Sequence, residues 1–510
     1  MGGRRVLIRI FAVFGALALI LLAGCSTIPQ DASSGVPDAT RPSSAPIVPR
    51  ELRLALGWAS KAGYNPYLTG SRINLDLAPL LFEGLTVMDD RMTARPQMAQ
   101  SVRNSGTELT AVLKSGLVFS DGLPVTNADV IASFNKAKSS ANYSALLVNV
   151  KSVREEAGAL LFTLQHPDIH AGACLTFPVL PKDYVGSEEP RGGGMYIIEN
   201  FQLRQNPYHP VKAANPFIGL AEAPDRDALL RGLENGTVGY FFNDLAGGDI
   251  PHITTRGAAS VPLPYLIFLG VNSRRAPFSD SRLRQAVNLS LGRADIVRDA
   301  FPGYADPALT PYPPAFAAAE KLGGIAAAAD PGAAGDLLIA AGYNARKQKD
   351  PELKNLAKPL TADLVVNSGN PLLTAAANQI RSQLAAAGIA VNVVPLSFDE
   401  YKSRLSSGNF DLYLGGIRLS ANLSLYPLLP SGAVSYGVAA GNPAVDAYKQ
   451  YLADELTLEG FAEEFWQALP YIPVCWQRGM AVYNRSLSGI APTGFNPYYG
   501  IEGWRVASSE

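Results

Sequence analysis

Residues 360–423 read LTADLVVNSGNPLLTAAANQIRSQLAAAGIAVNVVPLSFDEYKSRLSSGNFDLYLGGIRLSANL, and this stretch decides the fold. Its first residues, 360–366, form an apolar run that is typical of a strand. Apolar side chains then recur at helical spacing from residue 370 to residue 387, and Gly388 follows as a stop signal. The first half of the stretch therefore predicts a strand followed by an amphipathic helix.

The second half of the stretch repeats this order. Residues 389–394 predict a second strand. Ser397 and Glu400 have the spacing of a capping box, which predicts the start of a short helix. Residues 410–414 predict a third strand, so the stretch forms a β-α-β-α-β unit with parallel strands and right-handed crossovers. The predicted fold class is therefore α/β.

The segment after the third strand, residues 415–423, is the first candidate for a binding site. Sheets of this kind bind ligands beyond the carboxyl ends of their strands, so we expect this segment to lie at a cleft. Its polar members are Arg418, Ser420 and Asn422. An ordinary surface loop is the alternative interpretation.

A second buried strand is predicted before this unit. Residues 265–271 form a continuous apolar run. Ser279 is then placed to cap a helix that begins shortly afterwards. Three arginines on or near this helix are expected on its solvated face: Arg282, Arg284 and Arg293.

The N-terminus carries the pattern of an export signal. A basic start precedes an uncharged run over residues 10–23, and Gly24 is followed by Cys25. This order is typical of a secretory signal, and the cysteine makes it resemble a bacterial lipoprotein signal. In such proteins residues 1–24 are removed and Cys25 is lipidated. The alternative is an uncleaved membrane anchor, which needs about 20 apolar residues, more than this run offers.

Residues 25–50 predict a flexible linker behind the lipidated cysteine. They are rich in serine and proline and offer little to bury. Such a linker would hold a folded body away from a membrane surface.

The composition excludes several classes of function. The 510 residues carry a net charge of −1, which gives no basic field for nucleic acid. The sequence has no P-loop, no GxSxG elbow and no HExxH helix, so no nucleotide hydrolysis and no common hydrolase site is predicted. Four histidines and three cysteines without a CxxC pair predict no metal site and no cofactor. Cys174 and Cys475 leave open a disulfide or two buried thiols.

A series of short motifs runs through the chain from about residue 50 to about residue 508. The main motifs are Asn65-Pro66-Tyr67, Phe82-Glu83-Gly84-Leu85, Phe119-Ser120-Asp121-Gly122, Pro124 to Asp129, Asn272, Pro277-Phe278, Arg284-Gln285-Ala286, Phe410-Asp411, Asn442-Pro443 and Ile472-Pro473. Their order and spacing resemble the family 5 bacterial extracellular solute-binding proteins, the large peptide and nickel type that feeds ABC importers.

The resemblance implies a two-lobed periplasmic-binding-protein-like fold (type II, large peptide-binding class) with a hinge and an interlobe ligand cleft. Lobe I would comprise residues 51–262 plus 478–510, with a subdomain at about 76–186, and lobe II would comprise residues 263–477. The lobes would close over a small solute or peptide. Permease and ATPase subunits would be the protein partners, and the chain itself would be a monomer without catalytic residues or cofactor.

One departure from the family concerns the ligand. Peptide binders of the family usually carry an aspartate in the segment after the third strand, where it pairs with the amino end of the peptide. Here Ile417 and Ser420 take the corresponding positions, with Arg418 between them, and residues 412–444 contain no acid. An Arg418 that faces the cleft would favour a carboxylate, phosphate or sulfate group. A solvated, outward-facing Arg418 is the alternative.

Aromatic side chains are the other candidate ligand contacts, because they bind sugars and peptide side chains without charge. By position the candidates are Trp58, Tyr67, Tyr401, Tyr436 and Trp476, and for Trp476 a place in the core is expected. The complete set of predicted ligand contacts is Asn65, Tyr67, Tyr401, Arg418, Ser420, Asn422 and Tyr436.

The sequence therefore predicts a lipid-anchored substrate-binding protein of an ABC importer, on the extracytoplasmic face of the cell membrane (periplasm or cell surface). Its solute would be peptide-like or another small polar or anionic compound. The alternative keeps the fold but changes the role to a lipoprotein that regulates envelope synthesis or senses a ligand without import. A hydrolase is disfavoured, since adjacent carboxylates such as Glu155 and Glu156 point apart along a strand or helix.

Overall fold

The computed structural model describes residues 54–245, 256–322, 328–343 and 359–507. Every described residue belongs to one compact unit within residues 48–510. The predicted signal peptide, Cys25 and the predicted linker lie outside the described residues. Within the described ranges no helix has the length and apolar character that crossing a membrane requires.

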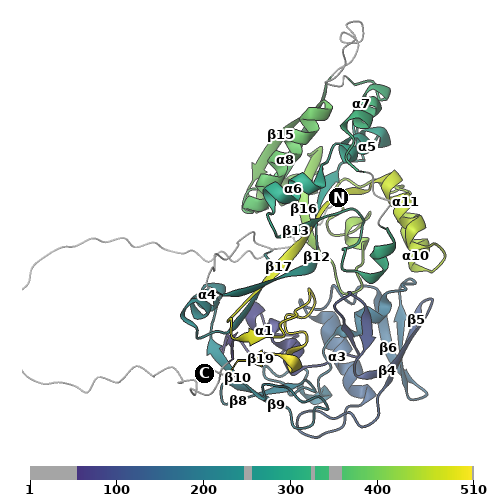
Figure 1. Ribbon diagram of the computed structural model, residues 1–510. Coiled ribbons are helices and arrows are strands. Elements are labelled where there is room, and N and C mark those ends of the chain that lie inside the picture. Colours follow the sequence, from purple (N-terminus) through teal and green to yellow (C-terminus); the bar gives the residue numbers. More distant parts are fainter. Residues whose placement is uncertain (1–53, 246–255, 323–327, 344–358, 508–510) are drawn as a thin grey trace, which may run out of the picture. The chain divides into compact units, whose positions relative to one another are not determined.

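A mixed sheet of eleven strands runs through this unit (Figure 1). Its order is β15-β14-β16-β12-β17-β11-β1-β10-β9-β8, and β13 pairs with β17. The strands are β1 (Ala55–Trp58), β8 (Tyr196–Glu199), β9 (Gln202–Gln205), β10 (Phe217–Glu222), β11 (Tyr240–Asn243), β12 (Gly257–Val271), β13 (Ala305–Pro307), β14 (Leu360–Asn367), β15 (Ile389–Leu396), β16 (Leu412–Arg418) and β17 (Tyr471–Tyr483).

Two long strands join the halves of this sheet. β12 has 15 residues and β17 has 13, and they pair antiparallel along most of their length. On its other edge β12 pairs with β16, and on its other edge β17 pairs with β11. In Figure 1 both strands run from the neighbourhood of β10 up to that of β16.

The predicted β-α-β-α-β unit is confirmed. β14 pairs in parallel with β15 and with β16, so the three strands lie in the order β15-β14-β16. Between them lie α8 (Pro371–Ala387) and α9 (Phe398–Ser406). Gly388 ends α8 with a φ of 103°, which glycine adopts without strain, and the predicted capping box opens α9.

The predicted end of the third strand was wrong. β16 continues past Leu414 to Arg418, and it pairs with β12 up to the register Tyr265 opposite Arg418. The predicted strand ended before Gly416, but in the structure the ring of Tyr265 packs over this glycine. A Cβ at Gly416 would lie 2.8 Å from that ring. The glycine therefore makes room for an aromatic neighbour inside a strand, and Arg418 is a strand residue.

The prediction for the helix after β12 was partly wrong. The helix α5 (Ser281–Leu289) is capped by the carboxylate of Asp280, not by Ser279. Arg282 is exposed, as expected, and pairs with Asp280. Arg284 and Arg293 are buried instead of solvated. Their guanidinium groups donate to carbonyl oxygens of distant segments, which the sequence around the helix does not reveal.

A second, antiparallel sheet lies in the N-terminal part, with the order β4-β5-β7-β6. Its strands are β4 (Ala99–Ser105), β5 (Glu108–Leu113), β6 (Val150–Glu156) and β7 (Ala159–Leu164). Two small sheets pair β2 (Thr86–Met88) with β3 (Ala94–Pro96), and β18 (Leu487–Ser488) with β19 (Arg505–Val506). The remaining α-helices are α1 (Arg72–Asp76), α2 (Ala78–Leu81), α3 (Asn127–Ser139), α4 (Arg226–Asn235), α6 (Arg293–Ala300), α7 (Pro331–Ala340), α10 (Ala444–Leu452) and α11 (Leu458–Ala468).

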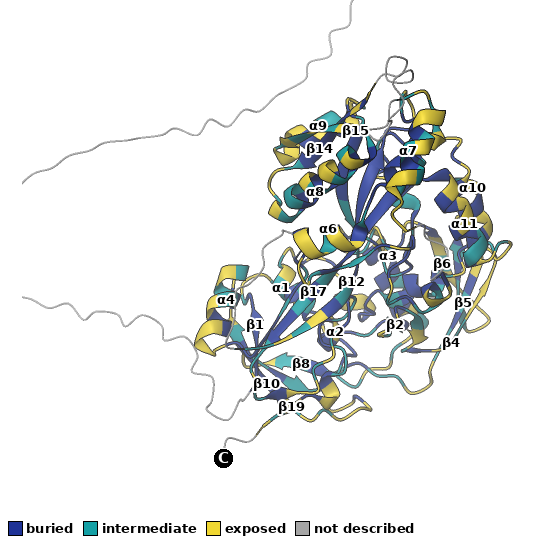
Figure 2. Cartoon of the chain, turned by 45° about the horizontal axis from the view of Figure 1, so that its top comes forward, coloured by how far each residue is buried: buried dark blue, intermediate teal, exposed yellow. Residues whose placement is uncertain are grey.

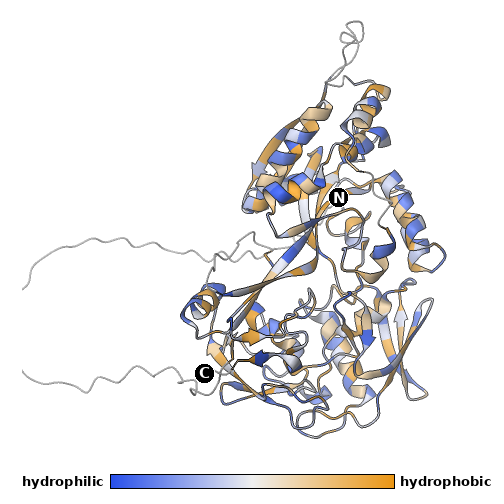
Figure 3. Cartoon of the chain, viewed as in Figure 1, coloured by the Kyte–Doolittle hydropathy of each residue, from blue (hydrophilic) through white to orange (hydrophobic). Residues whose placement is uncertain are grey.

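Two large hydrophobic cores pack against the sheet, one against each half of it. One is built mainly from residues between 266 and 476, and it contains the fully buried Trp476 that the sequence places in the core. The other combines residues between 54 and 261 with the C-terminal residues up to Trp504. Figure 2 shows exposed residues on the outer faces of helices such as α6, with mostly buried strands behind them. In Figure 3 these helices carry apolar and polar residues side by side.

The two cysteines lie in different cores. Cys174 belongs to the core that contains Trp504, and Cys475 belongs to the other. Both are buried free thiols, and burial raises the pKa of each above its usual value. Of the two alternatives that the sequence left open, the structure therefore has the buried thiols.

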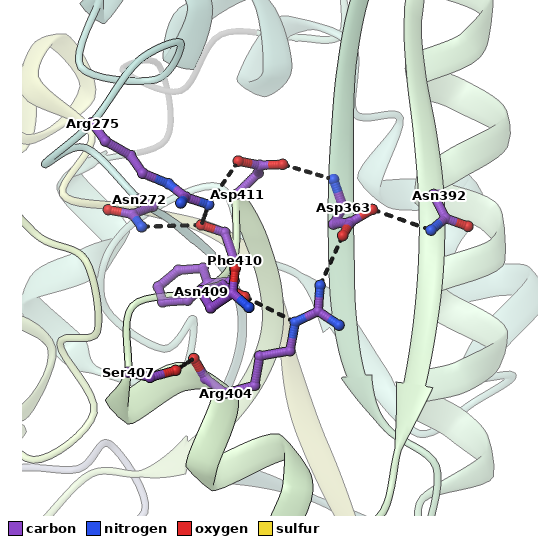
Figure 4. A network of polar contacts seen from close by, with 9 residues as sticks. All are labelled: Asn272, Arg275, Asp363, Asn392, Arg404, Ser407, Asn409, Phe410 and Asp411. Atoms are coloured by element: carbon purple, nitrogen blue, oxygen red, sulfur yellow. Dashed lines mark hydrogen bonds and ion pairs between the residues drawn. The ribbon is translucent and has the colours of Figure 1, made fainter.

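Hydrogen bonds around Asp411 join β14, the start of β16 and the segment that follows β12 (Figure 4). The Asp411 carboxylate accepts a hydrogen bond of 3.0 Å from the backbone N–H of Asp363 and one of 3.1 Å from Arg275. Asn272 and Arg275 both donate to the carbonyl oxygen of Phe410, at 3.0 and 2.7 Å. These family motif residues thus have a structural role in fixing β16 against β12 and β14.

Candidate functional site

A cavity of about 310 Å³ brings Arg418 together with residues from distant parts of the chain. Its walls come from α1, α2, β2, β11, the end of β16 and the C-terminal segment 494–497. The charged and aromatic side chains that line the cavity are Arg72, Asp76, Phe82, Tyr143, Phe242, Arg418 and Phe495. Apolar walls with a few charged groups are typical of small-molecule sites.

Arg418 reaches this cavity because it is the last residue of β16. Its guanidinium Nη2 donates to the carbonyl oxygen of Gly494, and its Nη1 lies 3.5 Å from Asp244 Oδ2. Nη1 is buried and donates no hydrogen bond to any described residue. Burial lowers the pKa of the guanidinium, and so does Arg72, while Asp244 raises it. Even a lowered arginine pKa leaves the group charged at neutral pH.

Arg72 and Asp76 face the same cavity from α1. They are four residues apart, so they share a helix face, and Arg72 Nε lies 2.8 Å from Asp76 Oδ1. Arg72 Nη2 also lies 3.7 Å from Asp244 Oδ2. Burial raises the pKa of the Asp76 carboxyl, and the neighbouring Arg72 opposes that rise. The site therefore holds two arginines and two aspartates at close quarters.

The other two polar residues of the predicted binding segment lie elsewhere. Ser420 Oγ donates to Asn422 Oδ1 at 2.7 Å, and Asn422 Nδ2 donates to Asp168 Oδ2 at 2.9 Å. Asp168 is buried and also accepts from the backbone N–H of His170 at 2.8 Å. Asn422 and His170 line a separate cavity of about 260 Å³. The structure therefore places only Arg418 of the three at the 310 Å³ cavity.

Residues 166–170 form a polar contact with residues 422–452. Besides the bond from Asn422 to Asp168, the backbone N–H of Ile169 donates to the carbonyl of Leu452 at 3.0 Å. The His170 ring nitrogen Nε2 lies 2.7 Å from the hydroxyl of Tyr451. This contact joins the N-terminal part of the chain to the part that holds β16.

The remaining predicted contacts make hydrogen bonds within the fold. Asn65 is buried, accepts from the backbone N–H of Tyr67 at 2.9 Å and donates to two carbonyls of residues 185–187. The buried hydroxyls of Tyr67 and Tyr401 donate to the carbonyls of Pro178 and Leu414. Tyr436 lines a third cavity, of about 460 Å³. Trp58 is buried in the core of the N-terminal half.

Sequence reasoning did not single out four residues of this site: Arg72, Asp76, Tyr143 and Asp244. The spacing of Arg72 and Asp76 behind the helix cap Ser71 is a local signal. It is also the pattern of an ordinary exposed ion pair. Nothing in the sequence indicates that Asp244 and Arg418, which are far apart along the chain, meet.

Comparison with known proteins supports the fold and the family. The family model for the bacterial extracellular solute-binding proteins, family 5, matches residues 93–432. This chain is a family 5 extracellular solute-binding protein. The glutathione-binding protein GsiB of Shigella boydii is a family relative with 23% identity, over 85% of this chain and 91% of its own length. The oligopeptide-binding protein AppA of Bacillus subtilis is 22% identical, over 85% of each chain.

The fold agrees with solved structures as well. A nickel ABC transporter structure from Bacillus halodurans matches 88% of this chain and 98% of its own with a TM-score of 0.70, at 18% identity. The predicted two-lobed α/β fold is thereby confirmed. Family 5 proteins are transport binding proteins that work outside the cytoplasm, and they are not enzymes.

Proposed function

We propose that this family 5 protein is the lipid-anchored substrate-binding protein of an ABC importer. Residues 1–24 would be removed, Cys25 would carry the lipid, and residues 25–50 would link it to the binding body. The body would capture a solute by closure of its lobes and deliver it to a permease. Family membership supports the solute-binding role, and the lipoprotein pattern at Cys25 supports the anchor.

One observation carries the proposal for the binding site, namely the 310 Å³ cavity that contains Arg418. With the predicted lobe boundaries, 51–262 plus 478–510 and 263–477, its lining comes from both lobes. Arg418 and Ala421 belong to lobe II, and the other lining residues belong to lobe I. A ligand in this cavity would touch both lobes, which is what capture by closure requires.

The chemistry of the cavity favours a small solute with a carboxylate group. Arg72 and Asp76 form a short ion pair, so most of their charge is balanced within the pair. Arg418 has only a longer contact, 3.5 Å to Asp244 Oδ2, and an arginine pairs a carboxylate through two parallel hydrogen bonds. The volume of the cavity suits a peptide of a few residues or a smaller solute. We therefore propose Arg418 as the ligand contact in this cavity.

An uptake measurement tests the proposal. Cells that lack this protein should lose uptake of one solute class, and the intact chain should restore it. Cys25→Ser should abolish incorporation of labelled palmitate, whereas the matched control Cys475→Ala should keep it. Retained labelling in Cys25→Ser would exclude this residue as the anchor. Normal uptake without the protein would favour the regulatory or sensing role instead.

A further inference from the structure

Asp244 holds an unusual position between two guanidinium groups. One carboxylate oxygen, Oδ2, lies 3.5 Å from Arg418 Nη1 and 3.7 Å from Arg72 Nη2. Hydrogen bonds between such groups measure about 2.7–2.9 Å, so both contacts are ion pairs at a distance and not hydrogen bonds. The carboxylate is thus close enough to balance Arg418 electrostatically without satisfying its Nη1 donor.

The two arginines differ in their other partners. Arg72 has a second carboxylate, Asp76, at 2.8 Å. For Arg418, Asp244 is the one carboxylate within ion-pair distance among the described residues. Asp244 itself lines the adjoining cavity of about 650 Å³, whereas Arg418 lines the 310 Å³ cavity. An anion in the smaller cavity would therefore contact the guanidinium of Arg418, whose charge is already partly neutralised by Asp244 in the adjoining cavity.

We propose that Asp244 is a specificity-determining residue that competes with the ligand carboxylate for Arg418. This inference rests on the proposed function, because it assumes that the 310 Å³ cavity is the ligand site. In the empty protein Asp244 balances Arg418. When a carboxylate ligand forms short hydrogen bonds to Arg418, Asp244 keeps its contact of 3.7 Å with Arg72, whose charge is already mostly balanced by Asp76. The negative charge of Asp244 then opposes the ligand, which lowers the affinity for every anion in the cavity.

The consequence is that charge alone holds an anion only weakly in this cavity. A bare inorganic anion would gain only the contact with Arg418 and would face the repulsion of Asp244. A larger solute would face the same repulsion but would also gain contacts with the apolar walls around Phe82, Phe242 and Phe495. Only a carboxylate solute that fills the cavity would therefore bind tightly. Removing the charge of Asp244 should increase anion affinity, which is the opposite of what a ligand-contacting residue would show.

The test compares Asp244→Asn with the wild-type mature chain at low salt. The probes are a pool of random tripeptides with free carboxyl ends and the same pool with amidated ends, measured by titration calorimetry. Asp244→Asn should bind the acid pool roughly tenfold more tightly, since a like charge is lost near the ligand. Binding of the amide pool should not change.

Two controls keep the result specific. Asp446→Asn makes the same change in net charge at an exposed site outside the lining of the cavity, and it should leave the binding of both pools unchanged. Asp244→Glu keeps the charge and should keep the lower wild-type affinity. Circular dichroism of Asp244→Asn confirms that the variant is folded.

Several outcomes would overturn the inference. Unchanged or weaker binding of the acid pool by Asp244→Asn would do so, as would an equal gain for the amide pool. Failure of the wild type and the variant to bind the acid pool would also reject it, because the inference requires a carboxylate-binding cavity. The proposed function would survive that last result if another solute raised the melting temperature of the wild type and depended on the protein for uptake.

Discussion

The unit β14 to β16 and the walls of the Arg418 cavity differ in how their contacts run along the chain. In the β14 to β16 unit, strand and helix alternate within residues 360–418, and each helix has its own cap or stop signal. At the cavity, charged groups from residues 72–76, 244 and 418 meet with backbone from residue 494. The β14 to β16 unit is therefore determined by residues close together in the sequence, whereas the site depends on charged residues that are far apart in the sequence.

This difference predicts where mutations act. Changes in the buried polar contacts of the β12–β17 half should reduce stability with little effect on ligand preference. Changes at the cavity should alter ligand preference with little effect on stability.

The largest effect is expected for Arg284→Ala. The buried guanidinium donates to the carbonyls of Phe278, Ser279 and Ala468, at 3.0, 3.1 and 3.0 Å. Its loss removes all three of these hydrogen bonds, and only the longer bond of 3.3 Å from Asn442 remains at Ala468. We expect the free energy of unfolding to fall by roughly 3–5 kcal/mol. Urea unfolding measures the change. The control on the same helix is Arg282→Ala, which removes an exposed arginine and should have little effect. Equal losses would contradict the buried role of Arg284.

An intermediate effect is expected for Asn422→Ala, which removes the donor at 2.9 Å from the buried carboxylate of Asp168. The free energy of unfolding should fall by about 1–3 kcal/mol, because a buried carboxylate loses a hydrogen bond. Ser420→Ala removes only the hydroxyl that donates to Asn422 and should cost less. A greater loss in Ser420→Ala than in Asn422→Ala would show that Asp168 does not depend on this contact.

The smallest effect concerns pH. Burial lowers the pKa of His170, although Asp168 raises it, so the folded protein binds this proton less readily than the unfolded chain does. An unfolded histidine has a pKa of about 6.5, so stability should fall as the pH drops through that value. In His170→Gln the fall between pH 7 and pH 5 should be shallower. A steeper fall in the variant would reverse the sign of this contribution.

Much of the fold could be predicted from the sequence. The helical spacing over residues 370–387, the stop at Gly388 and the capping box of Ser397 and Glu400 all depend on neighbours within a few positions. The errors arose where a distant segment decides. Gly416 lies in a strand because Tyr265 of β12 packs over it. Arg284 is buried because the carbonyl of Ala468 accepts from it.

The candidate site could be predicted only in part. Arg418 was found because an arginine stands where peptide binders of the family usually carry an acid. Its surroundings could not be found, since Asp244 and the carbonyl of Gly494 reach it only through the pairing of β16 with β12 and the return of the C-terminal segment. The motifs that indicated the family include Asn65 and Asp411, and the side chains of both make hydrogen bonds within the fold.

The most direct test of the central claim, that the Arg418 cavity binds a carboxylate, is calorimetry of Arg418→Gln with the acid and amide tripeptide pools. A hydrogen bond to a charged group contributes about 1.5–3 kcal/mol, so affinity for the acid pool should fall roughly 10- to 150-fold. Affinity for the amide pool should stay as in the wild type. An equal loss for both pools, or an unchanged affinity for the acid pool, would contradict the claim.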